Sequence, residues 1–239
     1  MIRLRTGPAA LFGAIFVLAL ILLLPLRFAL GWFDLDRTGF AARAASGSVW
    51  GGSLREAQLG SIALGDVDAA LSPWALLAGR ARLALEGHPS GTGRALHGAV
   101  SVSRHSVGIE QMTAGVPVGD AFAPLPITAI DLDDVSVRFV DGRCERAEGR
   151  VKATLGGDIA GITLGQGLAG AARCDAGALL LPLVSQAGTE QVTVRLWDSG
   201  RFRAEFLAKP SDAAAAQKLE RSGFQHMPNG YLLAVEGKF

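Results

Sequence analysis

The sequence predicts a mainly β protein of one or more curved antiparallel sheets, with one N-terminal transmembrane helix and one or two short helices. Glycine supplies 31 of the 239 residues, and so much glycine would be costly in helices. In the rest of the chain, short stretches of apolar residues alternate with polar ones, which is typical of half-buried strands. One long apolar run lies near the N-terminus.

That apolar run, Ala9–Leu26, predicts a membrane anchor. A helix over these 18 residues nearly spans a hydrocarbon core of about 30 Å. Phe28–Phe33 can extend it with Trp32 at the interface, so we assign residues 1–33 to the cytoplasmic N-terminus and the anchor. A cleaved signal peptide is the alternative, but its apolar region usually has about 7–15 residues. The longer run favours an uncleaved anchor.

Charge predicts how the chain is oriented. Arg3 and Arg5 precede the apolar run, which keeps the N-terminus in the cytoplasm by the positive-inside rule. Everything after Asp34 is then expected on the other side of the membrane, which in a Gram-negative bacterium is the periplasm, and the expected location is the cell inner membrane. The chain carries 23 basic and 22 acidic residues, so no electrostatic feature favours a nucleic-acid partner.

The rest of the chain divides into a short linker and one β-rich domain. We expect a juxtamembrane linker at residues 34–45 and a periplasmic domain at residues 46–239. Three prolines fall between Met112 and Pro126, which predicts a long connector there. The domain is therefore expected to have two halves, about 46–115 and 127–239.

Gly47–Glu86 predicts a strand, a short helix and a second strand. Ser72 can cap the helix, Pro73 suits its first position, and Gly79 can end it in a left-handed conformation. The following strand is predicted from apolar residues that alternate with charged ones. Its apolar residues are Ala81, Leu83 and Leu85.

Further strands are predicted where period-two patterns flank turn signals. They cover residues 100–103, 130–139, 151–155, 192–196, 202–206 and 231–236. Gly177–Val184 fits either a buried strand or a helical turn around Pro182. Ser211 can cap a helix from Asp212 to Arg221.

The two cysteines, Cys144 and Cys174, fit no CxxC or zinc spacing. In a cytosolic protein they would be two buried thiols, but outside the cytosol a disulfide is expected. It would close a loop of about 30 residues and stabilise the fold by about 3.5 kcal/mol in the chain-entropy model.

Signals for chemistry are weak. Gly165–Gly170 matches GxGxxG, and Glu190 lies at about the distance of a ribose-binding acid. The motif needs a following helix to hold a pyrophosphate, and Ala171–Gly177 is too short and interrupted for one. We interpret it as a glycine-spaced strand.

Other polar residues also have structural explanations. The acidic cluster at Asp131, Asp133 and Asp134 lacks EF-hand spacing, so a solvated strand end is expected. The histidines are scattered and form no metal-binding pair; they are His88, His97, His105 and His226. The three tryptophans of the domain are expected in core or half-core positions; they are Trp50, Trp74 and Trp197. We therefore predict no catalytic residue, no metal, no cofactor and no enzyme.

Two glycine and tryptophan motifs carry a family resemblance. The string Gly47-Ser48-Val49-Trp50-Gly51-Gly52-Ser53-Leu54, followed by Pro73-Trp74-Ala75-Leu76-Leu77-Ala78-Gly79, resembles type II secretion system protein N, also called general secretion pathway protein N. Later matches are Gly142-Arg143-Cys144, Ala147-Glu148-Gly149, Cys174, Gly223-Phe224, Gly230-Tyr231 and Glu236-Gly237. The structural motif residues are Gly47, Trp50, Leu54, Pro73, Trp74, Leu77 and Gly79.

The resemblance implies an inner-membrane accessory component of the type II secretion pathway. Such a protein would act through interactions with other secretion subunits, and no catalytic residue is implied. A weaker likeness, in the Leu-Leu-x-Gly turn, is to AsmA-like periplasmic modules that bind lipids or other hydrophobes. An open inward face would favour lipid binding, and a filled core would favour subunit interactions. The residues that decide are Leu83, Leu85, Val100, Val102, Val135 and Val137.

Overall fold

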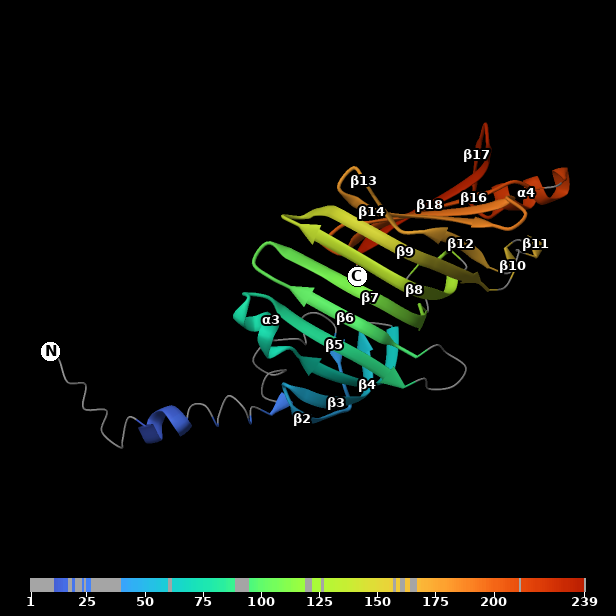
Figure 1. Cartoon of the computed structure of the whole chain (residues 1–239). Coiled ribbons are helices and arrows are strands. Elements are labelled where there is room, and N and C mark those ends of the chain that lie inside the picture. Colours follow the sequence, from blue (N-terminus) through green and yellow to red (C-terminus); the bar gives the residue numbers. More distant parts are fainter. Residues whose placement is uncertain are drawn as a thin grey trace.

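One antiparallel sheet dominates the protein (Figure 1). The computed structural model describes residues 11–16, 19, 23, 25–26, 40–59, 62–88, 95–118, 122–125, 127–156, 158–159, 162–163, 167–210 and 212–238. Two helices are placed among the strands, α3 (Pro73–Leu77) and α4 (Ala213–Arg221). The first strands are β1 (Phe40–Ala41), β2 (Ala44–Ser48), β3 (Gly51–Leu59), β4 (Ile62–Leu71), β5 (Ala81–His88), β6 (His97–Val102), β7 (Ser106–Pro117), β8 (Ile127–Val140) and β9 (Arg143–Leu155). The remaining strands are β10 (Asp158–Ile159), β11 (Ile162–Thr163), β12 (Leu168–Ala171), β13 (Arg173–Asp175), β14 (Ala178–Ser185), β15 (Glu190–Leu196), β16 (Arg201–Ala208), β17 (Gln225–Met227) and β18 (Gly230–Lys238).

The main sheet follows the chain almost strand by strand. Its 16 strands run in the order β1-β3-β4-β5-β6-β7-β8-β9-β12-β14-β15-β16-β18-β17, with β2 paired to β3 and β13 to β14. Strands β10 and β11 form a separate two-stranded hairpin. The prediction of a mainly β, antiparallel protein with few short helices is confirmed.

A single apolar face runs across this sheet, and we call it the inner face. Strand register places its residues in cross-strand rows, since side chains alternate between the two faces of a strand. One row is Leu71, Leu83, Val100, Ile109 and Val137 on β4 to β8. Another is Leu183, Val192, Phe206 and Leu233 on β14, β15, β16 and β18. The alternating patterns of the sequence therefore all contribute to one face.

The larger core covers the inner face in the second half of the sheet. Val135 and Val137 of β8 are buried there, together with apolar side chains of β9, β14, β15 and β16. The segment between β7 and β8 adds Phe122, whose ring meets that of Phe202 edge-on with centroids 5.2 Å apart. Leu219 of α4 is also buried in this cluster. The sheet thus curls around its own side chains and is closed by a loop and a helix.

A smaller core covers the first part of the same face. Its buried members are Leu26, Leu54, Ala57, Val67 and Ala69. Leu83 and Leu85 are packed against it and only partly buried. Since alanine supplies two of the five buried side chains, this cluster buries less apolar surface than the larger core.

Bulges curve the sheet where side chains would otherwise change face. Glu56, Gln111 and Asp134 have positive φ values of 49°, 48° and 52°, and the register shifts beside each of them. Gly149 lies opposite the Asp134 bulge, and a Cβ there would be 2.5 Å from the carbonyl oxygen of Asp134. Asp133 forms an ion pair with Arg150 at 3.1 Å. In the acidic cluster predicted from sequence, Asp133 is therefore paired with a cation and Asp134 forms a bulge of the sheet.

Several predicted boundaries shift. β7 extends to Pro117, so Met112–Pro117 is a strand and not part of a connector. Phe40–Ala41 and Ala44–Ser48 pair with β3, so the sheet begins inside the predicted linker. Asp212, and not Ser211, is the N-cap of α4: its side chain accepts a hydrogen bond from the Ala215 amide at 2.7 Å. The division at residues 46–115 and 127–239 stays a prediction.

Among the described residues, no helix has the length and apolar character needed to cross a membrane. Much of the predicted anchor, Ala9–Phe33, lies outside the described residues. Its later part includes Leu26, which is packed in the smaller core with only 7% of its surface exposed. The predicted transmembrane helix therefore stays a prediction, and its residue Leu26 contacts the sheet.

Candidate functional site

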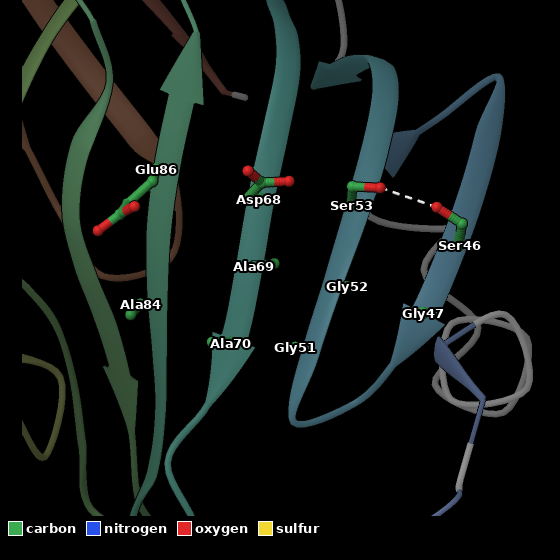
Figure 2. Close-up of a pocket in the computed structure, with 10 residues that line it drawn as sticks. All are labelled: Ser46, Gly47, Gly51, Gly52, Ser53, Asp68, Ala69, Ala70, Ala84 and Glu86. Atoms are coloured by element: carbon green, nitrogen blue, oxygen red, sulfur yellow. Dashed lines mark hydrogen bonds between the residues drawn. The ribbon is translucent and has the colours of Figure 1, made fainter.

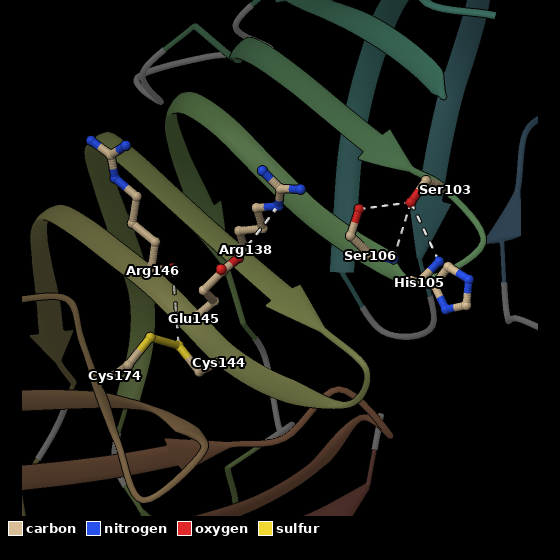
Figure 3. A network of polar contacts seen from close by, with 8 residues as sticks. All are labelled: Ser103, His105, Ser106, Arg138, Cys144, Glu145, Arg146 and Cys174. Carbon is tan, nitrogen blue, oxygen red and sulfur yellow. Dashed lines mark hydrogen bonds and ion pairs between the residues drawn. A yellow bond between two sulfur atoms is a disulfide. The ribbon is translucent and has the colours of Figure 1, made fainter. Parts of the chain in front are cut away.

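The disulfide predicted between Cys144 and Cys174 is present (Figure 3). It joins β9 to β13, with the two Cα atoms 5.5 Å apart. The Cys144 amide also donates a hydrogen bond to the Gly177 carbonyl at 2.8 Å. The bond therefore fixes the start of β9 against the turn that leads into β14.

The first glycine motif forms a tight hairpin that holds the N-terminal segment. β2 and β3 pair from Ala44 to Ser48, and Gly47 has a φ of +88° that favours glycine. Pro25 forms an isolated antiparallel bridge with Ser48. A Cβ at Gly52 would lie 2.8 Å from Cδ2 of Leu26 and 2.7 Å from the Ser46 carbonyl oxygen. Gly52 therefore leaves the space in which Leu26 packs.

The same hairpin borders an open hollow of about 480 Å³ (Figure 2). Small residues of β2, β3, β4 and β5 line it, and Ser46 and Ser53 share a hydrogen bond of 2.8 Å. Asp68 and Glu86 add two acidic side chains on neighbouring strands. The hollow follows from the lack of bulky side chains here and contains no arrangement of a nucleophile with a base.

The second motif forms α3, and its apolar side chains face outward. Pro73 starts the helix after Ser72, although the Ser72 side chain makes no capping hydrogen bond. Gly79 follows with a φ of +74°, as predicted for the helix end. Trp74 is 79% exposed and Leu77 81% exposed. The expectation that Trp74 is a core or half-core residue is wrong, whereas Trp50 and Trp197 are half-buried.

The inner face is only partly filled between its two cores. Val135 and Val137 are buried, while Leu83, Leu85 and Val100 are half-buried. Val102 is 46% exposed, and its cross-strand partner Val107 is 41% exposed. Val107 was not among the residues singled out from sequence; its alternation with Gly108 and Ile109 was the available signal.

A hollow of about 220 Å³ adjoins these two valines, at the turns that follow β6, β8 and β15. His105 lies 3.1 Å from Asp141 there, and Asp198 of a distant turn also lines it. Figure 3 shows the hydrogen-bonded turn of Ser103 and Ser106 beside it. Because His105 and Asp141 are both exposed, water screens their interaction.

Other polar groups act within the sheet. The Arg82 side chain on β5 donates a 2.8 Å hydrogen bond across β6 to Glu110 on β7, and this bond lowers the pKa of Glu110. Within the described ranges, no group of three or more His, Cys, Asp or Glu side chains could hold a metal ion. The described part of the GxGxxG match, from Gly167, leads into strand β12, which is the glycine-spaced strand expected from sequence.

These features define an antiparallel sheet protein with one disulfide. Its distinctive surfaces are exposed apolar side chains and a hollow lined mainly by small residues. The family model for type II secretion system protein N matches residues 38–232. The chain belongs to this family, a family of secretion components, and so has a role in the type II secretion system. Comparison with curated proteins and with solved structures gave no match.

Proposed function

We propose that the chain is an inner-membrane accessory component of the type II secretion system, which supports export across the outer membrane by binding other subunits. The observation that carries the proposal is the family match over residues 38–232. The apolar run that begins at Ala9 would hold the protein in the inner membrane, and the sheet would lie in the periplasm. The disulfide supports this compartment, because disulfides persist where thiols are oxidised.

The edge of the sheet at β18 offers a surface for such binding. β18 pairs with β16 from Tyr231 to Lys238. On its other side β17 covers only Gly230–Leu232, so Leu233–Lys238 has no further strand beside it in the described chain. Unpaired strand edges accept strands of other proteins through main-chain hydrogen bonds. A partner subunit would extend the sheet here.

The test uses the full chain in a cell with the complete secretion system. A photoreactive residue replaces Ala234 on the free edge, and the control replaces Glu145, an exposed residue of the internal strand β9. We expect secretion subunits to copurify with both proteins, and a cross-link to one of them only from position 234. Absence of all secretion subunits would contradict the assembly role. Copurification without that cross-link would contradict only the edge as the binding surface.

A second candidate function is binding of lipid or another hydrophobe on the inner face. The observation that favours it is the exposed pair Val102 and Val107, which continues the buried rows of that face. A lipid acyl chain would cover these side chains as the larger core covers Val137. Mass spectrometry of lipids that copurify with the protein tests this, with Val107→Glu as the variant. Equal lipid content in both would contradict the proposal.

A further inference from the structure

Helix α3 carries apolar side chains that nothing in the described chain covers. Trp74 and Leu77 are the two most exposed large apolar residues of the sheet region, and Leu76 beside them is also exposed. The first turn of the helix contains no acidic residue, and the exposed Arg80 follows shortly after it. Apolar clusters of this kind mark binding surfaces for proteins or membranes. Tryptophan in particular is enriched at the interface between membrane and water.

The position of α3 narrows the choice to a membrane. The Leu71 amide, just before α3, donates a 3.1 Å hydrogen bond to the Val49 carbonyl in the β2–β3 turn. Ser48, next to Val49, is the residue that pairs with Pro25. Figure 1 shows α3 and the β2–β3 turn at the same end of the sheet, where the N-terminal segment joins it. Helix α3 therefore lies beside the point at which the apolar run meets the fold.

The length of the apolar run determines how near this point lies to the bilayer. Since Pro25 and Leu26 are held by the sheet, only residues 9–24 remain for the hydrocarbon core. At 1.5 Å per residue such a helix is about 24 Å long, against a core of about 30 Å. A short span pulls its flanking residues toward the headgroups or thins the bilayer locally. The end of the sheet that holds Leu26 would then sit in the headgroup layer.

We propose that α3 is a second membrane contact, in which Trp74 and Leu77 insert into the interface of the bilayer that holds the N-terminal run. The inference rests on the membrane anchor proposed above. The Trp74 ring has an apolar body and a polar N–H, which suits the boundary between headgroups and acyl chains. Leu77 adds apolar area on the same short helix, and Arg80 can reach lipid phosphates. Two attachments at one end would fix the tilt of the sheet relative to the membrane.

The experiment places a polarity-sensitive dye on single new cysteines in the full chain. Because Cys144 and Cys174 are joined, only the new thiol reacts. The positions are Trp74→Cys and Leu77→Cys, with Gln186→Cys in the exposed turn after β14 as the control. Each protein is reconstituted in vesicles of phosphatidylethanolamine and phosphatidylglycerol that contain a lipid with a shallow spin label. Retention after alkaline carbonate extraction is measured in the same samples.

The expected result is retained protein, with quenching by the spin label several-fold stronger at positions 74 and 77 than at 186. Retained protein with equal quenching at all three positions would overturn the α3 contact and leave the anchor intact. Loss of the protein on carbonate extraction would overturn the anchor and the α3 contact together. If secretion subunits added to the vesicles shield the dyes at 74 and 77 while the lipid spin label does not quench them, the helix is assigned to a protein partner and the proposal is overturned.

Discussion

Gly52→Ala should weaken the attachment of the N-terminal segment to the sheet. The new Cβ would lie 2.8 Å from Leu26 Cδ2 and within 2.9 Å of two backbone carbonyl oxygens. Real Cβ atoms do not approach so closely, so Leu26 or the hairpin must move. Overpacking of this kind costs about 1–3 kcal/mol. Its neighbour Gly51 is the matched control, since a Cβ there meets nothing within 4 Å.

The size of the effect can be checked against the partner side chain. Leu26→Ala removes three buried carbon atoms, which corresponds to about 2.4 kcal/mol of transfer free energy at 0.8 kcal/mol for each methylene. A residual cavity would add to this value. In the double variant Leu26→Ala with Gly52→Ala, the clash with Cδ2 is absent. The loss of stability in the double variant should therefore be smaller than the sum of the losses in the two single variants.

The assay is urea unfolding of the full chain in detergent, followed by circular dichroism of the sheet. Limited proteolysis between residues 26 and 40 reports separately on release of the N-terminal segment. Gly51→Ala should match the parent protein in both measurements. If Gly52→Ala is as stable and as resistant as Gly51→Ala, the packing of Leu26 over Gly52 does not hold the segment, and the reasoning fails.

Four further predictions concern stability. Trp74→Ala should change the free energy of unfolding by no more than about 0.5 kcal/mol because the ring is exposed, whereas Phe206→Ala should cost about 3–5 kcal/mol because that ring is buried; equal losses in urea unfolding would contradict both. Serine at both Cys144 and Cys174 should lower stability by about 3.5 kcal/mol, and an unchanged urea midpoint would refute this. His105→Ala should leave folding and export near the parent level, since its contact with Asp141 is exposed; a stable variant that abolishes export would reveal a hidden site. Arg82→Gln should cost less than about 1 kcal/mol at neutral pH, and the difference should vanish in acid: the pKa of Glu110 is lowered in the folded protein, so its stabilisation is present above the unfolded pKa and is lost as the pH falls through the folded pKa. A pH-independent difference in urea unfolding would contradict the last assignment.

The strands could be predicted because each has one polar, solvent-facing side and one apolar side. Val192 and Val194 alternate with polar residues in the sequence. In the structure these two valines are buried, and the residues between and beside them are more exposed. The residues of local turns were also predicted correctly; Gly79 ends α3 in the left-handed conformation expected from the sequence. Both signals depend on neighbouring residues, so they need no knowledge of the tertiary fold.

What sequence could not predict depends on contacts between distant residues. The smaller core needs Leu26, which belongs to the segment interpreted as an anchor, and no local pattern shows that it folds back onto Gly52. Trp74 was expected inside because large aromatic residues usually have a place in the core. In this fold leucine, alanine and valine side chains form the smaller core beside β4 and β5, and none of the residues of α3 is buried in it.

The two glycine and tryptophan motifs become physically connected once the contacts are known. Gly52 makes room for Leu26, Ser48 pairs with Pro25, and Val49 accepts a hydrogen bond from Leu71, two residues before α3. One motif therefore receives the N-terminal segment, and the other presents Trp74 beside it. Neither motif brings together groups that could perform acid–base or nucleophilic chemistry. A sheet that receives the N-terminal segment at one end and is cross-linked by the Cys144–Cys174 disulfide in its second half keeps its edges in a defined orientation, which suits the proposed role in binding other subunits.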